Sequence, residues 1–218
     1  NVGNPHKAVL ITGAARNLAR EIAINPVSQT VDRGRSLVVR VAGLVMPDSE
    51  KLAETVRSAA SDQALYQECV TVAIYCLAFG DHLRLKSTKT LGELALAGFV
   101  ANIGKSRLPA KIRMRTNDLA PREEILVRRH PEMSMEMVDR LIYPETRVGQ
   151  GILLHHEHRD GSGFPKGIRG QQIPMVAQLV GLADLYDEGV RESGQEGSAA
   201  ALASLQALST QYQHAFDR

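Results

Sequence analysis

Aromatic residues are scarce in this sequence of 218 residues, which contains four Phe, five Tyr and no Trp. Proteins that bind single-stranded nucleic acid stack the bases on displayed aromatic rings, so a platform of that kind is not expected here. Proteins that bind duplexes carry a strongly basic surface, whereas the formal net charge of this chain is only +2. The composition therefore argues against a nucleic-acid-binding function.

Cysteine and long apolar runs are also in short supply. The two cysteines, Cys69 and Cys76, are seven positions apart, which on one helix separates them by about 10 Å along the axis. That is too far for a disulfide, so we expect a reduced, cytoplasmic compartment. No apolar run reaches the roughly 18 residues of a membrane-spanning helix. Residues 1–7 lack the features of a signal peptide and an initiator Met, and we interpret the chain as a fragment of a longer polypeptide.

The apolar residues that are present follow a helical period almost throughout. Leu65, Cys69, Val72, Cys76 and Phe79, for example, form one face of a helix. Alternation typical of a strand never extends beyond four residues. Helices are expected over residues 8–23, 35–46, 51–59, 65–79, 91–103, 130–141, 148–156, 175–188 and 198–216. A further short helix is expected to begin at Pro121. The sequence thus predicts an all-α bundle with an N-terminal helical region, residues 1–60, and a main domain, residues 61–218.

A polar motif at the end of one expected helix is a candidate site. His155, His156 and Glu157 are followed by a loop, residues 159–173, that contains four glycines. Imidazole is a good ligand for Fe, Mn, Zn and Ni, and a glycine-rich loop lets backbone N–H groups approach a phosphate. A solvated polar helix end explains the same residues without a ligand.

Two further residues add to this motif. Asp184 lies in an otherwise apolar helical turn, where an unpaired carboxylate is costly unless it binds a metal or forms a buried salt bridge. His130 precedes Pro131 at the start of a helix, where it could also serve as an N-terminal cap. The order of the three features along the chain is more specific than any one of them.

With these residues the sequence resembles the HD-GYP family, over about residues 61–217. Residues 155–165 are similar to the family's HHE-x-x-DG-x-GYP signature, with Phe164 in place of the Tyr. Residues 103–105 match the end of the family's HD-IGK motif, and Leu108-Pro109 follow as in the family. The segments 168–174 and 183–187 match in sequence and spacing.

The resemblance implies a helical bundle that hydrolyses cyclic di-GMP to pGpG or GMP with two or three metal ions, often iron. It implies His130, His155, His156 and Asp184 as metal ligands, with Lys105 contacting the substrate phosphate or helping to protonate the leaving group. The nucleotide-binding or phosphate-binding set that we expect consists of Lys105, Arg159, Asp160, Gly161, Gly163, Phe164 and Pro165.

The sequence departs from the family at the HD pair itself, which aligns with Ala101 and Asn102. Ala101 has no ligand atom, and Asn102 offers a neutral amide where the family uses a bridging carboxylate. The family's early His aligns with Glu68 or, within one residue, with Cys69. Two metal ions bring four positive charges within about 4 Å of each other, and at an effective dielectric of ~20 two unit charges at that distance interact by roughly 4 kcal/mol. Without the bridging carboxylate we expect no dinuclear centre and no catalytic residue beyond the remnant Lys105.

The expected cofactor is therefore none, or a single divalent ion such as Fe, Mn, Zn or Ni. Its ligands would be His130, His155, His156 and Asp184, with Glu68 as a further candidate. These residues would otherwise hydrogen-bond to one another around ordered water. Lys105 and the basic stretch over residues 105–130 suit an anion, although a solvated helix face has the same composition.

Three functions remain open on this basis. The sequence favours a catalytically inactive HD-GYP domain that acts in cyclic di-GMP signalling, binding cyclic di-GMP or a protein such as a diguanylate cyclase. The second is a cyclic di-GMP phosphodiesterase with an altered metal-ligand set. The third is a scaffold whose N-terminal helices mediate dimerisation, and we expect a dimer formed through those helices.

Overall fold

The fold is all-α, as the sequence predicted. The computed structural model describes residues 5–45, 64–113, 118–193, 199 and 202–206, and within these residues there are nine α-helices, two 3₁₀ helices and no strand. The expected helices over 51–59 and 198–216 lie wholly or mostly outside the described residues. The elements are α1 (Pro5–Ile24), α2 (Ser28–Val45), α4 (Ala64–His82), α5 (Thr88–Ala101), η1 (Ile103–Arg107), α6 (Ala110–Arg113), α7 (Pro121–Val127), α8 (His130–Val138), α9 (Arg147–Leu154), η2 (Gly170–Gln172) and α10 (Met175–Glu192).

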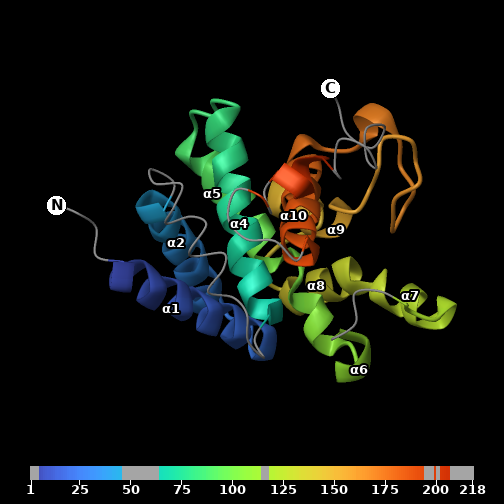
Figure 1. Ribbon diagram of the computed structural model, residues 1–218, viewed down its shortest axis with the longest axis horizontal. Coiled ribbons are helices and arrows are strands. Elements are labelled where there is room, and N and C mark those ends of the chain that lie inside the picture. The colour runs from blue at the N-terminus through green and yellow to red at the C-terminus, as the bar shows by residue number, and fades with distance from the viewer. Residues whose placement is uncertain (1–4, 46–63, 114–117, 194–198, 200–201, 207–218) are drawn as a thin grey trace.

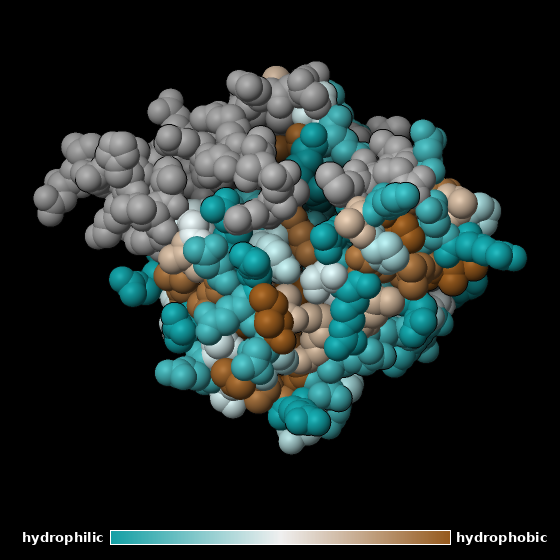
Figure 2. All heavy atoms as spheres, turned by 90° about the horizontal axis from the view of Figure 1, so that it is seen from below, coloured by the Kyte–Doolittle hydropathy of each residue, from teal (hydrophilic) through white to brown (hydrophobic). Residues whose placement is uncertain are grey.

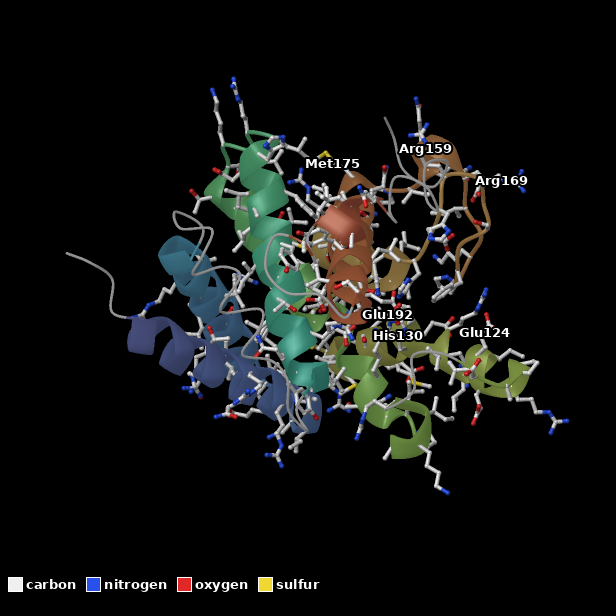
Figure 3. All side chains as sticks on the ribbon, in the orientation of Figure 1. Glu124, His130, Arg159, Arg169, Met175 and Glu192 are labelled. Carbon is white, nitrogen blue, oxygen red and sulfur yellow. The ribbon has the colours of Figure 1, made fainter. Side chains whose placement is uncertain are left out.

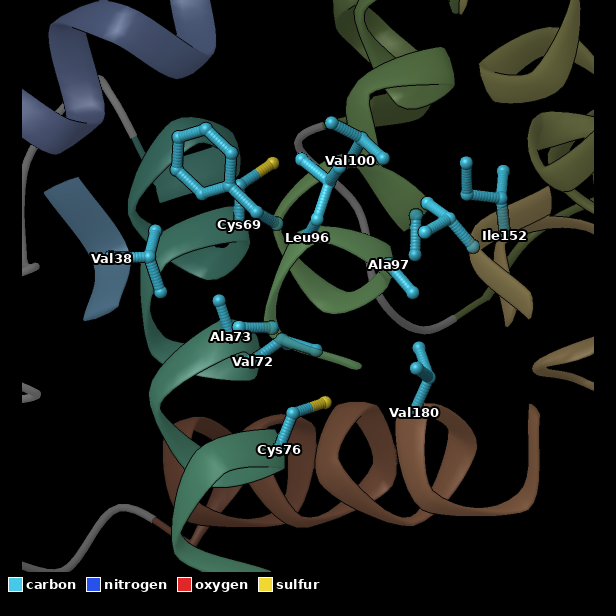
Figure 4. Packing of buried hydrophobic residues seen from close by; sticks show 14 of the residues in the cluster. Val38, Cys69, Val72, Ala73, Cys76, Leu96, Ala97, Val100, Ile152 and Val180 are labelled. Carbon is cyan, nitrogen blue, oxygen red and sulfur yellow. The ribbon is translucent and has the colours of Figure 1, made fainter. Parts of the chain in front are cut away.

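Helices α4 and α5 form the centre of the bundle. Figure 1 shows the α1–α2 pair on one side of them, α9 and α10 on the other, and α6 to α8 below. Every residue of α5 from Leu94 to Ala101 is buried. Gly98 lets α5 approach α4 closely, because a Cβ at Gly98 would lie 2.8 Å from Cys76 Sγ and 3.2 Å from Ala73 Cα. Figure 4 shows this packing around Ala73, Leu96 and Val180.

The first two helices share the core of the rest of the chain. Ala15, Ala19 and Ile22 of α1, with Val31 and Val38 of α2, belong to the same buried cluster as the residues of α4 and α5. The residues around the expected boundary at 60 and 61 lie outside the described part. The division into an N-terminal region and a main domain therefore stays a prediction, although α1 and α2 are packed on the bundle.

Local sequence signals explain where several helices begin. The Ser87 side chain accepts a hydrogen bond from Thr90 N at the start of α5, and Thr146 caps α9 in the same way through Gly149 N. Pro121 is at the start of α7, with Glu123 and Glu124 in its first turn, as the sequence predicted. No helix among the described residues is long and apolar enough to cross a membrane.

Some helices differ in length from the prediction. The α2 helix begins at Ser28 instead of 35, α8 ends at Val138, and α10 continues to Glu192. The helix expected over 91–103 ends at Ala101 because Ser134 Oγ donates to the Ala101 carbonyl, 2.6 Å away, and accepts from Gly104 N, 2.8 Å away. These two bonds replace helical ones, and the chain continues from Ile103 as the 3₁₀ helix η1.

Candidate metal centre

Three histidines from two parts of the chain meet in the interior of the bundle. His130 begins α8, His155 is the C-cap of α9, and His156 follows it. His130 Nε2 lies 3.3 Å from His155 Nε2 and 3.2 Å from His156 Nε2. One ligand nitrogen from each of the three lies within 4.8 Å of the others, so the group could hold a metal ion. The expected convergence of these histidines is confirmed.

Hydrogen bonds to the main chain fix the tautomers of two of these rings. His130 Nδ1 is 2.8 Å from the Val127 carbonyl, and His155 Nδ1 is 2.7 Å from the Ile152 carbonyl. Since a carbonyl only accepts, each Nδ1 must carry the proton and each Nε2 presents a lone pair. Two lone pairs then face each other across 3.3 Å. This arrangement is repulsive unless a cation lies between them, and it is the tautomer that metal-bound histidines adopt.

Protons do not supply that cation at neutral pH. Burial lowers the pKa of His130, His155 and His156, because the charged ring loses its water in the interior. The ammonium of Lys105 lowers the pKa of His130 and His156 further. The three rings are therefore neutral at neutral pH. Three neutral imidazoles fit a divalent metal of the Fe, Mn, Zn or Ni type.

Asp184, from α10, lies beside this group of histidines. Its Oδ2 lies 3.6 Å from His156 Nε2, and its Oδ1 accepts a hydrogen bond from Asn102 Nδ2 at 2.5 Å. Burial alone would raise the pKa of Asp184, but the Lys105 ammonium, together with the hydrogen bond from Asn102, holds that pKa below its ordinary value. Asn102 is fully buried, and its Oδ1 has no hydrogen-bond partner among the described residues.

Lys105 forms an ion pair with Glu68. Lys105 Nζ lies 2.6 Å from Glu68 Oε1, and the two side chains are only 21% and 7% exposed. Burial would lower the pKa of Lys105, but Glu68 and Asp184 raise it above its ordinary value. The sequence left Glu68 and Cys69 as alternatives for the family's early His. Glu68 reaches this site, whereas Cys69 packs in the hydrophobic core (Figure 4).

A second ion pair extends this network along α10. Arg191 Nη2 lies 3.6 Å from Glu68 Oε1, and Arg191 Nε donates to Asp187 Oδ2 at 2.8 Å. Burial raises the pKa of Asp187 to about 6, against the opposing effect of Arg191. Burial also raises the pKa of Glu188 to about 7. These charged groups lie within two turns of α10, so they shift one another's pKa values: Asp184, Asp187, Glu188 and Arg191.

Two glycines let the elements that carry the site approach one another. A Cβ at Gly104 would overlap the main-chain oxygen of His130, the amide of Ser134 and its hydroxyl. A Cβ at Gly181 would overlap the main-chain oxygen of His155. Lys105 and Asp184 are therefore placed beside the histidines by main-chain contacts that any larger residue would prevent.

The loop after His156 is held by its own hydrogen bonds. The buried carboxylate of Glu157 accepts from Lys166 N at 2.6 Å and from Ile168 N at 3.0 Å. The main-chain amides of Gly161, Ser162, Phe164 and Gly170 also donate within the loop or to the residues that precede it. Any phosphate contact near this loop would therefore have to come from side chains, or from amides that these bonds do not use.

Phe164 is the member of the expected phosphate-binding set that lies against the histidines. Its ring stacks on His156 at 4.5 Å between centroids, and Arg128 lies over it, 5.3 Å from Arg128 Cζ to the ring centroid. Asp160 is exposed and accepts from Ser162. Figure 3 shows Arg159 at the outer end of the loop, well away from His130. The remaining expected members, Gly161, Gly163 and Pro165, belong to the loop backbone.

Comparison with known proteins places this site in a family. The family model described as "HD domain" matches residues 50–218, more than half of the chain. The chain belongs to the HD domain family. This HD domain is 29% identical over 184 residues to a cyclic di-GMP phosphodiesterase of Pseudomonas aeruginosa, an alignment that covers 84% of the chain and 44% of that protein. It is 32% identical over 96 residues to a cyclic di-GMP phosphodiesterase of Thermotoga maritima, covering 44% of the chain and 26% of that protein.

A solved structure supports the fold. An HDG"Y"P protein from Bdellovibrio bacteriovorus superposes with a TM-score of 0.83 at 21% identity, covering 100% of this chain and 70% of that one. These matches agree with the HD-GYP resemblance of the sequence. The chain spans less than half the length of the two phosphodiesterases described above.

Sequence reasoning missed several residues of this HD domain's site. Arg191 and Asp187 were not assigned a role, although their spacing of four on a helix predicts an ion pair. Arg128 stood out only as part of a basic stretch, and nothing in the sequence pointed to its contact with Phe164. Glu157 was noted beside the His pair, but its role as the acceptor for two loop amides required the tertiary structure.

Proposed function

We propose that this HD domain is a catalytically inactive HD-GYP domain that acts in cyclic di-GMP signalling as a regulatory or protein-interaction module. In this proposal His130, His155 and His156, with Asp184, hold a single divalent ion. The relatives named as cyclic di-GMP phosphodiesterases support the substrate class. Partners such as a diguanylate cyclase, dimerisation through the N-terminal helices and a cytoplasmic location belong to the same proposal.

The observation that carries the proposal is the hydrogen bond from Asn102 to Asp184. Asn102 aligns with the family's metal-bridging carboxylate, but here it uses its amide nitrogen to occupy one oxygen of Asp184. Ala101 beside it brings no ligand atom. A second ion at this place would lack its bridging ligand and would also repel the first. The alternative, a phosphodiesterase with an altered ligand set, needs Glu68 as a ligand, and Glu68 is paired with Lys105.

The residues present suit a binding function. A divalent ion held by three imidazoles would act as a Lewis acid toward a phosphate oxygen. Phe164 offers a partly exposed aromatic ring beside the histidines, and Arg128 offers a guanidinium above that ring. Aromatic and guanidinium groups bind nucleobases and phosphates without any hydrolytic step. These groups support binding of cyclic di-GMP at this site.

The test separates hydrolysis from binding. Purified protein is supplied with Mn²⁺, Fe²⁺, Ni²⁺ or Mg²⁺, and cyclic di-GMP, pGpG and GMP are quantified by chromatography. No turnover above the buffer control is expected. Calorimetric titration with cyclic di-GMP is expected to show binding that weakens in Phe164→Ala and is kept in Phe164→Tyr. Turnover that disappears in His155→Ala would contradict the proposal and favour the phosphodiesterase.

A further inference from the structure

A pocket lies where α5, α9 and α10 begin, at the end of the bundle away from the histidine cluster. Its volume is about 340 Å³, toward the lower end of the range of roughly 300–1,000 Å³ that is typical of small-molecule sites. Asn102 and His155 lie at the other ends of α5 and α9, and Figure 3 shows Met175 well away from His130. The pocket is therefore separate from the candidate metal centre. Most of its wall is apolar and is formed by Leu85, Leu94, Pro174, Met175, Val176 and Leu179.

This apolar wall is open to solvent. Met175 is 53% exposed, and Leu85 and Val176 are half-buried. On the face of the molecule seen from below, apolar side chains are interspersed with hydrophilic ones (Figure 2), as is ordinary for a protein surface. In the pocket they are gathered around a concave space, which is the arrangement that receives the apolar part of a small ligand.

Two opposite charges line the same pocket. Glu93 of α5 and Arg147 of α9 form an ion pair, with Oε2 of the carboxylate 3.5 Å from Nη1 of the guanidinium. This separation is longer than that of a good hydrogen bond, and the Arg147 side chain is 62% exposed, so the pair contributes little to stability. Nη1 also donates to Thr90 Oγ1 at 3.1 Å. Within the described residues both contacts of the guanidinium use Nη1, which leaves Nε and Nη2 for a carboxylate.

The two charges indicate which kind of ligand fits. An anion would meet the Glu93 carboxylate as a like charge, and a cation would meet the Arg147 guanidinium. A zwitterion whose two charges are close together matches both. Lys89 also lies 4.0 Å from Glu93, but its side chain is 86% exposed, and solvent and salt screen its charge. The rest of the ligand has to be apolar to suit the wall of the pocket.

We propose that this pocket binds a free α-amino acid with an apolar side chain of the size of leucine or phenylalanine. The carboxylate of the ligand binds Arg147, its ammonium binds Glu93, and its side chain packs against Leu94, Val176 and Leu179. The loose ion pair of the empty pocket is thereby replaced by two ion pairs to the ligand. This site goes beyond the proposed function, since it requires neither a metal ion nor cyclic di-GMP.

The test is equilibrium dialysis of the purified protein against isotopically labelled L-leucine and L-phenylalanine. One molecule per chain is expected to bind for at least one of them, with a Kd of about 1 mM or below. Binding is expected to be the same with and without EDTA. Unlabelled analogues of the bound amino acid then compete with it. For leucine, 4-methylpentanoate lacks the ammonium and 3-methylbutylamine lacks the carboxylate, and each is expected to compete at least about tenfold less effectively.

Substitutions at the two charges place the ligand in this pocket. Glu93→Gln and Arg147→Gln are each expected to weaken binding about tenfold or more. Arg147→Lys keeps the positive charge and is expected to weaken it less. The matched control is Arg140→Gln, at an exposed position after α8, which is expected to leave binding unchanged. Circular dichroism checks that each variant is folded, as expected for side chains that are exposed or half-buried.

Each outcome decides the inference. No bound leucine or phenylalanine at up to about 10 mM would overturn it, as would an analogue without ammonium or carboxylate that competes as well as the amino acid. Binding that is lost in EDTA would place the amino acid on the metal ion, and equal weakening in Arg140→Gln would place it elsewhere on the protein. Either result would also overturn the inference. The proposed function is unaffected by these results, because cyclic di-GMP turnover and binding are measured separately.

Discussion

Asn102 donates a hydrogen bond from Nδ2 to Oδ1 of Asp184, joining the end of α5 to the middle of α10 across 82 positions of sequence. Both side chains are buried, with Asn102 fully so. An amide is a donor at this place, whereas a carboxylate would only be a second acceptor facing Asp184. The hydrogen bond therefore stabilises the ionised form of Asp184 and helps to lower its pKa.

Replacing this amide by a carboxylate should destabilise the metal-free protein. In Asn102→Asp, two buried carboxylates face each other, and we expect a loss of about 1–3 kcal/mol in the free energy of unfolding at neutral pH. Because the pair shares a proton, its folded-state pKa is raised above that of the unfolded chain. The loss should therefore grow as pH rises and shrink toward pH 4, as measured by urea unfolding in EDTA.

The matched control for that variant is Asn17→Asp, which makes the same change at an exposed position of α1. It should change the free energy of unfolding by less than about 0.5 kcal/mol. Addition of Mn²⁺ should recover part of the loss in Asn102→Asp and none in the control. Equal effects in the two variants would contradict the importance of the Asn102–Asp184 contact.

The histidine cluster should make the metal-free protein sensitive to acid. Burial lowers the pKa of His130, His155 and His156 in the folded state, so the unfolded chain binds more protons below its own pKa of about 6.5. The free energy of unfolding is therefore unaffected by protonation of these histidines above that pH, and it decreases as pH falls below it. Up to three protons correspond to a slope of roughly 4 kcal/mol per pH unit at most.

Urea unfolding between pH 8 and pH 5, in EDTA, measures this slope. His156→Gln should reduce it, because one of the protons taken up on unfolding is removed. His82→Gln, at an exposed position near the end of α4, should leave it unchanged. A flat profile in wild type over this range would show that the histidines are not held neutral.

Gly104 should be intolerant of substitution because η1 passes against the main chain of α8. An Ala side chain at this position overlaps the His130 carbonyl and the Ser134 amide, neither of which can move independently. We expect Gly104→Ala to lower the free energy of unfolding by about 2–4 kcal/mol, with a parallel loss of metal binding. Gly13→Ala in α1 is the control, since nothing lies within 4 Å of its Cβ position, and it should stabilise by about 0.5–1 kcal/mol.

Glu157 should determine how firmly the loop after His156 is held. In Glu157→Gln, one carboxylate oxygen that accepts from Lys166 N or Ile168 N becomes a donor. Hydrogen exchange at these two amides should become about tenfold faster or more, which corresponds to the loss of one charge-assisted bond. The exposed Glu145→Gln should not alter exchange there. Unchanged protection in Glu157→Gln would mean that the loop is held by other contacts.

Much of the fold followed from the sequence because helical periodicity is a local property. The stripe of Leu65, Cys69, Val72 and Cys76 predicted α4, and Pro121 with the two following glutamates predicted the start of α7. The end of α5 was misjudged by two residues. Its apolar pattern continues to Ile103, and only the contact with Ser134, which lies on another helix, ends the helix earlier.

The sequence by itself determined the candidate ligands, His130, His155, His156 and Asp184, and the loss of the HD pair at Ala101 and Asn102, because residue types and their order are written in the chain. Only the tertiary structure decided how the charges are paired. Lys105, for which a phosphate contact stays a prediction, is paired with Glu68, and Asn102 uses its amide on Asp184. Such pairings depend on which side chains are brought within about 3 Å in a region without water. That distance is set by the packing of α4, η1, α9 and α10, which no local pattern of the sequence specifies.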